Sequence, residues 1–209
     1  SIRLPLMASP TPPRTKAQQR EETTRALVSS ARRLFAEHGY AQVSLAQVVA
    51  DAGVTKGALY HHFRGKDDLF AAVSRQAHQD VGDRVAAAAD AAGSAGAEPW
   101  EQFLTGCRTF LTASTEAHIR QVMLIDSPSV LGWSAWRRLD ASTSRQHLEE
   151  VLTELVADGV VEPQPVAPLV HLLSGAMNEA ALWLADTDER REQALDDAMA
   201  ALTRMLDAL

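Results

Sequence analysis

One short stretch of the chain, residues 44–66, carries side chains that could contact the base edges and phosphate groups of DNA. A lysine at the start of a helix can reach a guanine edge or a phosphate. Hydroxyl, imidazole and ammonium groups are plausible phosphate partners, and a small residue such as glycine would let the backbone approach the groove floor. The candidate DNA-contacting residues are Ser44, Gln47, Thr55, Lys56, Gly57, Tyr60, His61, His62 and Lys66.

The elements that would position these residues are two short helices joined by a tight turn. Ser44 stands three residues before Gln47, which is the spacing of a capping box at a helix start. Gly53 suits a left-handed turn that ends this helix, and Thr55 is a cap for the next one. Any small helical hairpin shows apolar segments around a turn. The two caps and the polar outer face favour a helix-turn-helix, whose second helix fits the major groove of DNA.

The run AGVTKGALYHHFRGKDDLF, residues 52–70, resembles the DNA-binding core of the TetR family of bacterial transcriptional regulators, and LFAEHGY upstream resembles the end of its first helix. The resemblance covers roughly residues 23–70. It implies base contacts from Lys56 and Gly57, and phosphate contacts from Tyr60, His62 and Lys66. His61 departs from the aromatic residue that is frequent in the family at that position. The family also implies a two-helix dimerisation surface.

The charge distribution agrees with a DNA-binding N-terminal part. Residues 1–66 contain ten Lys and Arg against four Asp and Glu, a net charge of +6, whereas residues 67–209 contain ten against twenty-three, a net charge of −13. A basic third on an acidic body indicates that the first third meets a polyanion. We expect residues 1–19, with four prolines, to form a disordered basic arm. That arm could reach the minor groove or only aid solubility.

The cellular compartment follows from cysteine content and hydropathy. Cys107 is the single cysteine, so no intramolecular disulfide can form and a reducing compartment is favoured. Each apolar run is too short for a membrane span, and no signal peptide is recognisable. We therefore expect a cytoplasmic protein without a membrane partner. Met7 is an alternative start, in which case residues 1–6 would not be native.

Hydrophobic periodicity predicts an all-α chain with two domains, because no alternating strand pattern occurs. Residues 20–66 would form the helix-turn-helix DNA-binding domain, and residues 67–209 a helical domain for ligand binding and dimerisation. Expected helices outside the helix-turn-helix cover residues 21–38, 66–92, 98–114, 116–125, 133–157, 166–185 and 189–206.

The second domain has the composition of a ligand pocket inside a helical bundle, which is mostly apolar with a few placed polar groups. An ordinary hydrophobic core is the alternative for each of these residues. The candidate ligand-binding residues are Phe103, Cys107, Phe110, Met123, Trp133, Trp136, His171, Gly175 and Asn178.

The last two expected helices have apolar faces suited to a four-helix dimer interface. A dimer would place two recognition helices on a palindromic DNA site; the alternative is that these faces pack within one chain. The candidate interface residues are Leu169, Leu172, Leu173, Ala176, Leu195, Met199, Leu202 and Met205.

Catalysis and cofactor binding lack a motif in this sequence. Adjacent residues on a helix point about 100° apart, so His61 and His62 are poorly arranged to share a metal. A lone buried cysteine such as Cys107 is usually inert. Our hypothesis is therefore a homodimeric DNA-binding repressor, released from a palindromic operator by a small molecule and requiring no cofactor. The alternatives are a helical small-molecule-binding module and an activator without effector release.

Overall fold

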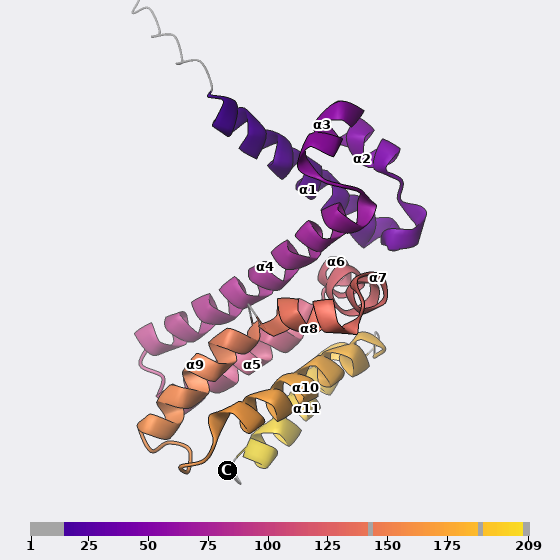
Figure 1. Cartoon of the computed structure of the whole chain (residues 1–209). Coiled ribbons are helices and arrows are strands. Elements are labelled where there is room, and N and C mark those ends of the chain that lie inside the picture. Colours follow the sequence, from indigo (N-terminus) through magenta and orange to yellow (C-terminus); the bar gives the residue numbers. More distant parts are fainter. Residues whose placement is uncertain (1–14, 142–143, 188–189, 207–209) are drawn as a thin grey trace, which may run out of the picture.

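The computed structural model describes residues 15–141, 144–187 and 190–206. Across these ranges the backbone forms helices, turns and bends and contains no strand, which confirms the all-α prediction (Figure 1). None of the helices in this described part of the chain has the length and hydropathy of a membrane span.

Three helices form the N-terminal part: α1 (Lys16–Gln42), α2 (Leu45–Asp51) and α3 (Lys56–His62). Helix α1 begins five residues before the predicted start because Thr15 and Gln18 form a capping box there. Residues 16–19 are therefore helical, and assigning them to a disordered arm was wrong. The rest of the predicted arm, residues 1–14, lies outside the described residues. The three helices share a core that includes Leu27, Phe35 and Leu59.

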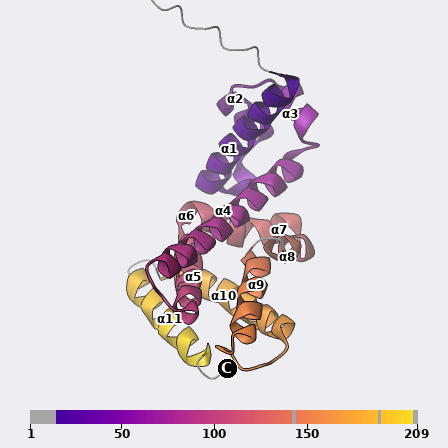
Figure 2. The same ribbon diagram turned by 90° about the vertical axis from the view of Figure 1, so that its left-hand side faces the viewer.

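Helix α4 (Lys66–Ser94) runs from this N-terminal part into the second domain, as predicted (Figures 1 and 2). It packs there along α5 (Pro99–Thr115). Helices α10 (Val166–Ala185) and α11 (Arg191–Leu206) complete the bundle, and the bounds of α10 are those predicted. A second apolar core, which includes Phe103, Leu111 and Leu173, lies among these helices.

Two further predictions of helix bounds were wrong. The helix predicted over residues 116–125 does not end there, because helical backbone continues through α6 (Ala117–Arg120), a π-helix η1 (Gln121–Asp126) and α7 (Ser127–Leu131). Pro128 is tolerated because it lies in the first turn of α7, where few backbone N–H groups have helical partners. The single helix expected over residues 133–157 is instead α8 (Trp133–Ala141) followed by α9 (Ser144–Ala157).

The π-helix η1 joins the two domains through a buried apolar side chain and a hydrogen bond. Its Val122 belongs to the N-terminal core, not to the core of its own domain. Asp126 accepts a hydrogen bond from the backbone N–H of Tyr40 in α1 at 2.8 Å. On the other side, the Nε1–H of Trp136 in α8 donates to the backbone carbonyl of Met123 at 3.0 Å. Helices α1 to α3 are thus tied to the second domain at η1 as well as through α4.

Candidate DNA-contacting surface and ligand cavity

Local caps fix α2 and α3 as the sequence predicts. Ser44 and Gln47 exchange hydrogen bonds at the start of α2, with Ser44 N–H donating to Gln47 Oε1 at 2.8 Å. Gly53 has φ 64° in the turn between the helices. The Thr55 hydroxyl accepts the backbone N–H of Ala58 at 3.1 Å at the start of α3. The orientation of α3 is therefore set by local hydrogen bonds and by the buried side chain of Leu59.

The exposed face of α3 carries most of the predicted DNA-contacting groups. Lys56, Gly57, Tyr60 and His61 are exposed and come from successive turns of one short helix. A Cβ atom added at Gly57 would meet only the Thr55 Oγ1 atom, at 3.9 Å, which is an ordinary contact. The fold itself does not require glycine at this position. The contact of Gly57 with a base edge stays a prediction.

Two predicted phosphate-contacting residues, His62 and Lys66, instead touch the protein. The Nδ1 atom of His62 lies 2.9 Å from the Thr24 hydroxyl of α1, and burial lowers the pKa of this imidazole. The Lys66 ammonium lies 4.0 Å from the ring centroid of Tyr40, and burial lowers its pKa also. Both side chains hold α3 and α4 against α1. Their contact with phosphate stays a prediction.

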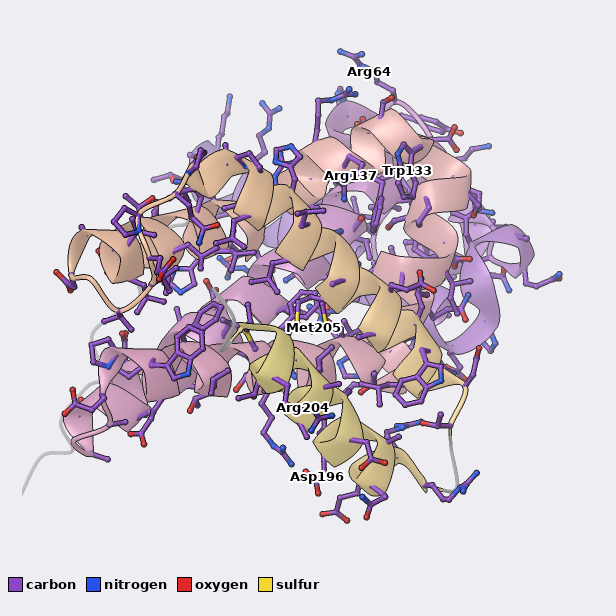
Figure 3. The ribbon with its side chains drawn as sticks, turned by 90° about the horizontal axis from the view of Figure 1, so that it is seen from below. Arg64, Trp133, Arg137, Asp196, Arg204 and Met205 are labelled. Carbon is purple, nitrogen blue, oxygen red and sulfur yellow. The ribbon has the colours of Figure 1, made fainter. Side chains whose placement is uncertain are left out.

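Arg64 is a cation that the sequence reasoning did not single out. It lies two residues after the end of α3 and is exposed, and its side chain points away from the ribbon in Figure 3. Arg20 of α1 lies close enough to His62 for its charge to lower the pKa of that imidazole. The clue in the sequence was the basic balance of residues 1–66, which includes both arginines.

A cavity of about 330 Å³ lies in the second domain between α4, α5, α8, α9 and α10. Three predicted residues, Phe103, Cys107 and Phe110, line it from α5. Burial raises the pKa of the Cys107 thiol to about 12, so this thiol is a neutral wall atom at ordinary pH. The remaining lining residues are Gly82, Val85, Ala89, Asp90, Pro99, Gln102, Gly106, Asp140, Arg145, His147, Leu148, Val151, Glu154, Leu155, Asp158, Ser174 and Met177.

The other six predicted ligand-binding residues do not line this cavity. Met123 and Trp136 are buried in the joint between η1 and α8. Trp133 is 64% exposed and lies beside Arg137, as Figure 3 shows.

The remaining three of these six belong to α10. His171 lies on the surface, with Nδ1 2.9 Å from the carbonyl of Ala167. Gly175 is partly buried, and Asn178 is buried one turn beyond the lining residue Ser174. The structure therefore does not bring these six residues to the cavity, and their contact with a ligand stays a prediction.

Half of the predicted dimer residues pack inside their own chain. Leu169, Leu173, Met199 and Leu202 are buried in the core of the second domain, so the intramolecular alternative holds for them. Leu195 is partly buried against that core. In contrast, Leu172 and Met205 are 74% and 66% exposed. Ala176 is also exposed.

An exposed tryptophan, Trp183, lies on the same helix as Leu172 and Ala176. Among the residues that the structure describes, no group of three His, Cys, Asp or Glu side chains could hold a metal ion.

Comparisons with known proteins agree with this arrangement. Residues 27–73 match the model of "Bacterial regulatory proteins, tetR family", and residues 100–209 match "Tetracyclin repressor-like, C-terminal domain". A crystal structure of a TetR-family transcriptional regulator from Pectobacterium atrosepticum is similar to 94% of this chain and 97% of its own, with 34% identity and a TM-score of 0.76.

Two curated relatives extend the comparison. The transposon Tn10 TetC protein of Escherichia coli is 24% identical over 169 residues, which are 81% of this chain and 83% of that protein. An HTH-type transcriptional repressor of Mycobacterium tuberculosis is 33% identical over 110 residues, which are 53% of this chain and 56% of that protein.

Proposed function

Since the chain belongs to the TetR family of bacterial transcriptional regulators, we propose that it acts as a homodimeric repressor, which a small molecule releases from a palindromic operator. The observation that carries this proposal is the course of α4. One end of this helix packs in the core of the helix-turn-helix domain through Leu69 and Phe70. The other end lines the cavity through Gly82, Val85 and Asp90. A molecule in the cavity therefore touches the helix that carries the DNA-binding domain.

The exposed face of α3 supports sequence-specific binding. In this proposal Lys56 contacts a base edge, while Tyr60, His61 and the newly recognised Arg64 contact phosphates. Lys56→Ala should weaken operator binding by about 1–3 kcal/mol and relax base preference. Arg64→Ala should weaken binding to all sequences and flatten the salt dependence. Arg138→Ala, at an exposed cation of α8, is the matched control.

The outer faces of α10 and α11 support dimerisation. Leu172, Ala176 and Trp183 recur at helical spacing on α10, and Met205 is exposed on α11. An apolar row of this kind is suited to pairing with the same row of a second copy. Leu172→Asp should give monomers in sedimentation experiments and weaken operator binding, because each half-site would then bind one recognition helix alone. Val160→Asp, at another exposed apolar residue, is the control.

Two routes connect the cavity with the DNA-binding helices in the proposed release. The first is α4 itself. The second starts at Asp140 of α8, which lines the cavity, and passes through Trp136 and Met123 to η1. It reaches α1 where Asp126 accepts the N–H of Tyr40. A shift of either route would change the spacing of the two recognition helices. That spacing must match one turn of DNA, about 34–36 Å.

The first test is a mobility shift of the purified protein with the DNA that surrounds its own coding region, over a range of salt concentrations. We expect sequence-specific binding with a steep salt slope. Weak and uniform binding to this DNA and to a randomised operator library would refute a sequence-specific repressor. The same complex then serves to screen for molecules that release the DNA.

A further inference from the structure

The charges on the cavity wall identify the chemical class of the molecule that the cavity takes. Four carboxylates line it: Asp90 of α4, Asp140 of α8, Glu154 of α9, and Asp158 in the turn directly after α9. Arg145 is the one arginine among the lining residues. Its Nη1 atom lies 3.4 Å from the Nε2 atom of His171, outside the cavity. The wall therefore has an excess of negative charge.

Three of these carboxylates are open to a cationic partner. Asp90, Glu154 and Asp158 are exposed and form no ion pair with any described residue. His147 also lines the wall, with its Nδ1 atom 3.9 Å from a carboxylate oxygen of Glu150. Because α4 contributes Asp90, and the C-terminal end of α9 with the turn after it contributes the other two acids, a cation between them would be attracted by both groups.

The fourth carboxylate, Asp140, carries negative charge into the protein. Its side chain is 3% exposed and accepts a hydrogen bond from the Ser174 hydroxyl at 3.1 Å. Burial raises the pKa of Asp140, whereas hydrogen bonds with Ser174 and Asn178 and the charges of Arg137 and Arg145 lower it. The buried position therefore disfavours the charged form of this carboxyl. Positive charge inside the cavity would stabilise it further.

The rest of the wall is apolar and partly aromatic. Phe103 and Phe110 come from α5, and Leu148, Val151 and Leu155 from α9. Aromatic faces attract cations and also bind ring systems. The volume of about 330 Å³ lies at the low end of the range for ligand pockets, roughly 300–1,000 Å³, and fits one or two rings.

We propose that the cavity binds a compact cationic amphiphile, with its apolar body between Phe103 and Phe110 and its positive charge among the carboxylates of α4, α8 and α9. This inference rests on the proposed function, in which the cavity is the effector site. It adds the charge and size of the effector. A neutral molecule of the same shape would bind the apolar wall but leave the acids without a partner.

The test compares phenyltrimethylammonium with tert-butylbenzene, in which a neutral carbon replaces the charged nitrogen, and with the anion benzenesulfonate. Calorimetric titration should give the cation a Kd at least about tenfold lower than either of the other two, with a gap that widens at low salt. Glu154→Gln/Asp158→Asn should remove most of this preference and leave tert-butylbenzene binding unchanged. Glu149→Gln/Glu162→Gln, at exposed acids outside the cavity, should change neither.

Equal or tighter binding of the neutral or anionic molecule would overturn the inference. So would an unchanged preference in Glu154→Gln/Asp158→Asn, or the absence of binding by all three molecules. Operator DNA in a parallel mobility shift separates this inference from the proposed function. If the cation binds the cavity but does not release DNA, the ligand class is right and effector release is wrong. If only the neutral or anionic molecule releases DNA, effector release is right and the ligand class is wrong.

Discussion

His78 gives the most quantitative prediction for this protein. It lies on α4, one helical turn before the cavity-lining Gly82, and its side chain is 1% exposed. Neither ring nitrogen has a hydrogen-bond partner among the described residues. Burial therefore lowers the pKa of this imidazole to about 4 from its ordinary value of 6.5. The folded protein holds His78 neutral at every pH at which an unfolded chain would begin to protonate it.

The sign of the pH effect follows from these two values. Because the pKa of His78 is lower in the folded state, the unfolded state binds the proton first as the pH falls. The stability contributed by neutral His78 is present above pH 6.5 and is lost between pH 6.5 and about pH 4. The full loss would be about 3 kcal/mol, and about 2 kcal/mol of it falls between pH 7 and pH 5.

The assay is urea unfolding at pH 7 and pH 5 for the native protein and for His78→Leu. Leucine has a similar volume and leaves no buried polar atom, so we expect little change in the free energy of unfolding at pH 7. The free energy of unfolding of His78→Leu, measured relative to that of the native protein, should be about 2 kcal/mol higher at pH 5 than at pH 7. His38→Leu, at an exposed histidine, should show no such gain. Asp140 and the other titratable groups are the same in both proteins, so they cannot produce a difference between them. If the free energy of unfolding falls equally from pH 7 to pH 5 in the native protein and in His78→Leu, the reasoning is refuted.

Three further predictions concern DNA, the domain joint and the cavity. Gly57→Ala should stabilise α3 by about 0.5–1 kcal/mol in thermal unfolding, yet weaken operator binding in a mobility shift, because the new methyl group has room in the fold but not at the groove. Asp126→Asn weakens the bond to the Tyr40 N–H; we expect a loss of about 1–2 kcal/mol in urea unfolding. Gly82→Leu should fill the cavity and abolish phenyltrimethylammonium binding in calorimetry without lowering Tm, since a Cβ atom there meets nothing within 4 Å. Unchanged DNA affinity, unchanged stability or retained cation binding, respectively, would contradict these expectations.

The helix-turn-helix was predictable because each signal acts within a few residues of the chain. Ser44 and Thr55 accept hydrogen bonds from N–H groups three residues later, and Gly53 adopts its positive φ on its own. The inward turn of His62 and Lys66 depends on Thr24 and Tyr40, which are distant in the sequence. The sequence therefore did not reveal that these two side chains contact α1, because those contacts join residues that are distant in the chain.

The sequence predicted a mostly apolar pocket in the second domain, but only some of the residues that line the cavity. Phe103, Cys107 and Phe110 of α5 do line the cavity, because this helix has one broad apolar face. Trp133 shares a face with Trp136 by spacing, yet it stands at the first residue of α8, where it stays exposed. The acids of α9 were missed because the phase of that helix depends on the break from α8.

An amphipathic pattern also cannot say which chain covers an apolar face. Leu169 and Leu172 both fit a helical stripe of α10, but only Leu169 packs in the core of its own chain. A residue must be exposed in the folded chain to be available for an interface with a second chain. Leu172 and Met205 are exposed and stay candidates for such an interface, whereas Leu173 and Met199 are buried.

In the proposed release, the length of α4 determines how far a small tilt at the cavity moves the start of this helix. Gly82 lies sixteen residues after Lys66, a distance of about 24 Å along the helix. A tilt of about 5° at the cavity would move the start of α4 by about 2 Å, and two protomers would double the change in spacing. The hydrogen bond between Asp126 and the Tyr40 N–H ties α1 to η1, so a movement of η1 is passed on to α1. In the proposed release η1 moves with α4, and the hydrogen bond from Trp136 to Met123 connects the cavity wall to η1. For this reason Asp126→Asn should leave the affinity for the ligand unchanged but weaken the coupling between ligand binding and DNA release. Calorimetry on this variant would measure the ligand affinity, and mobility shifts would measure how much DNA the ligand releases.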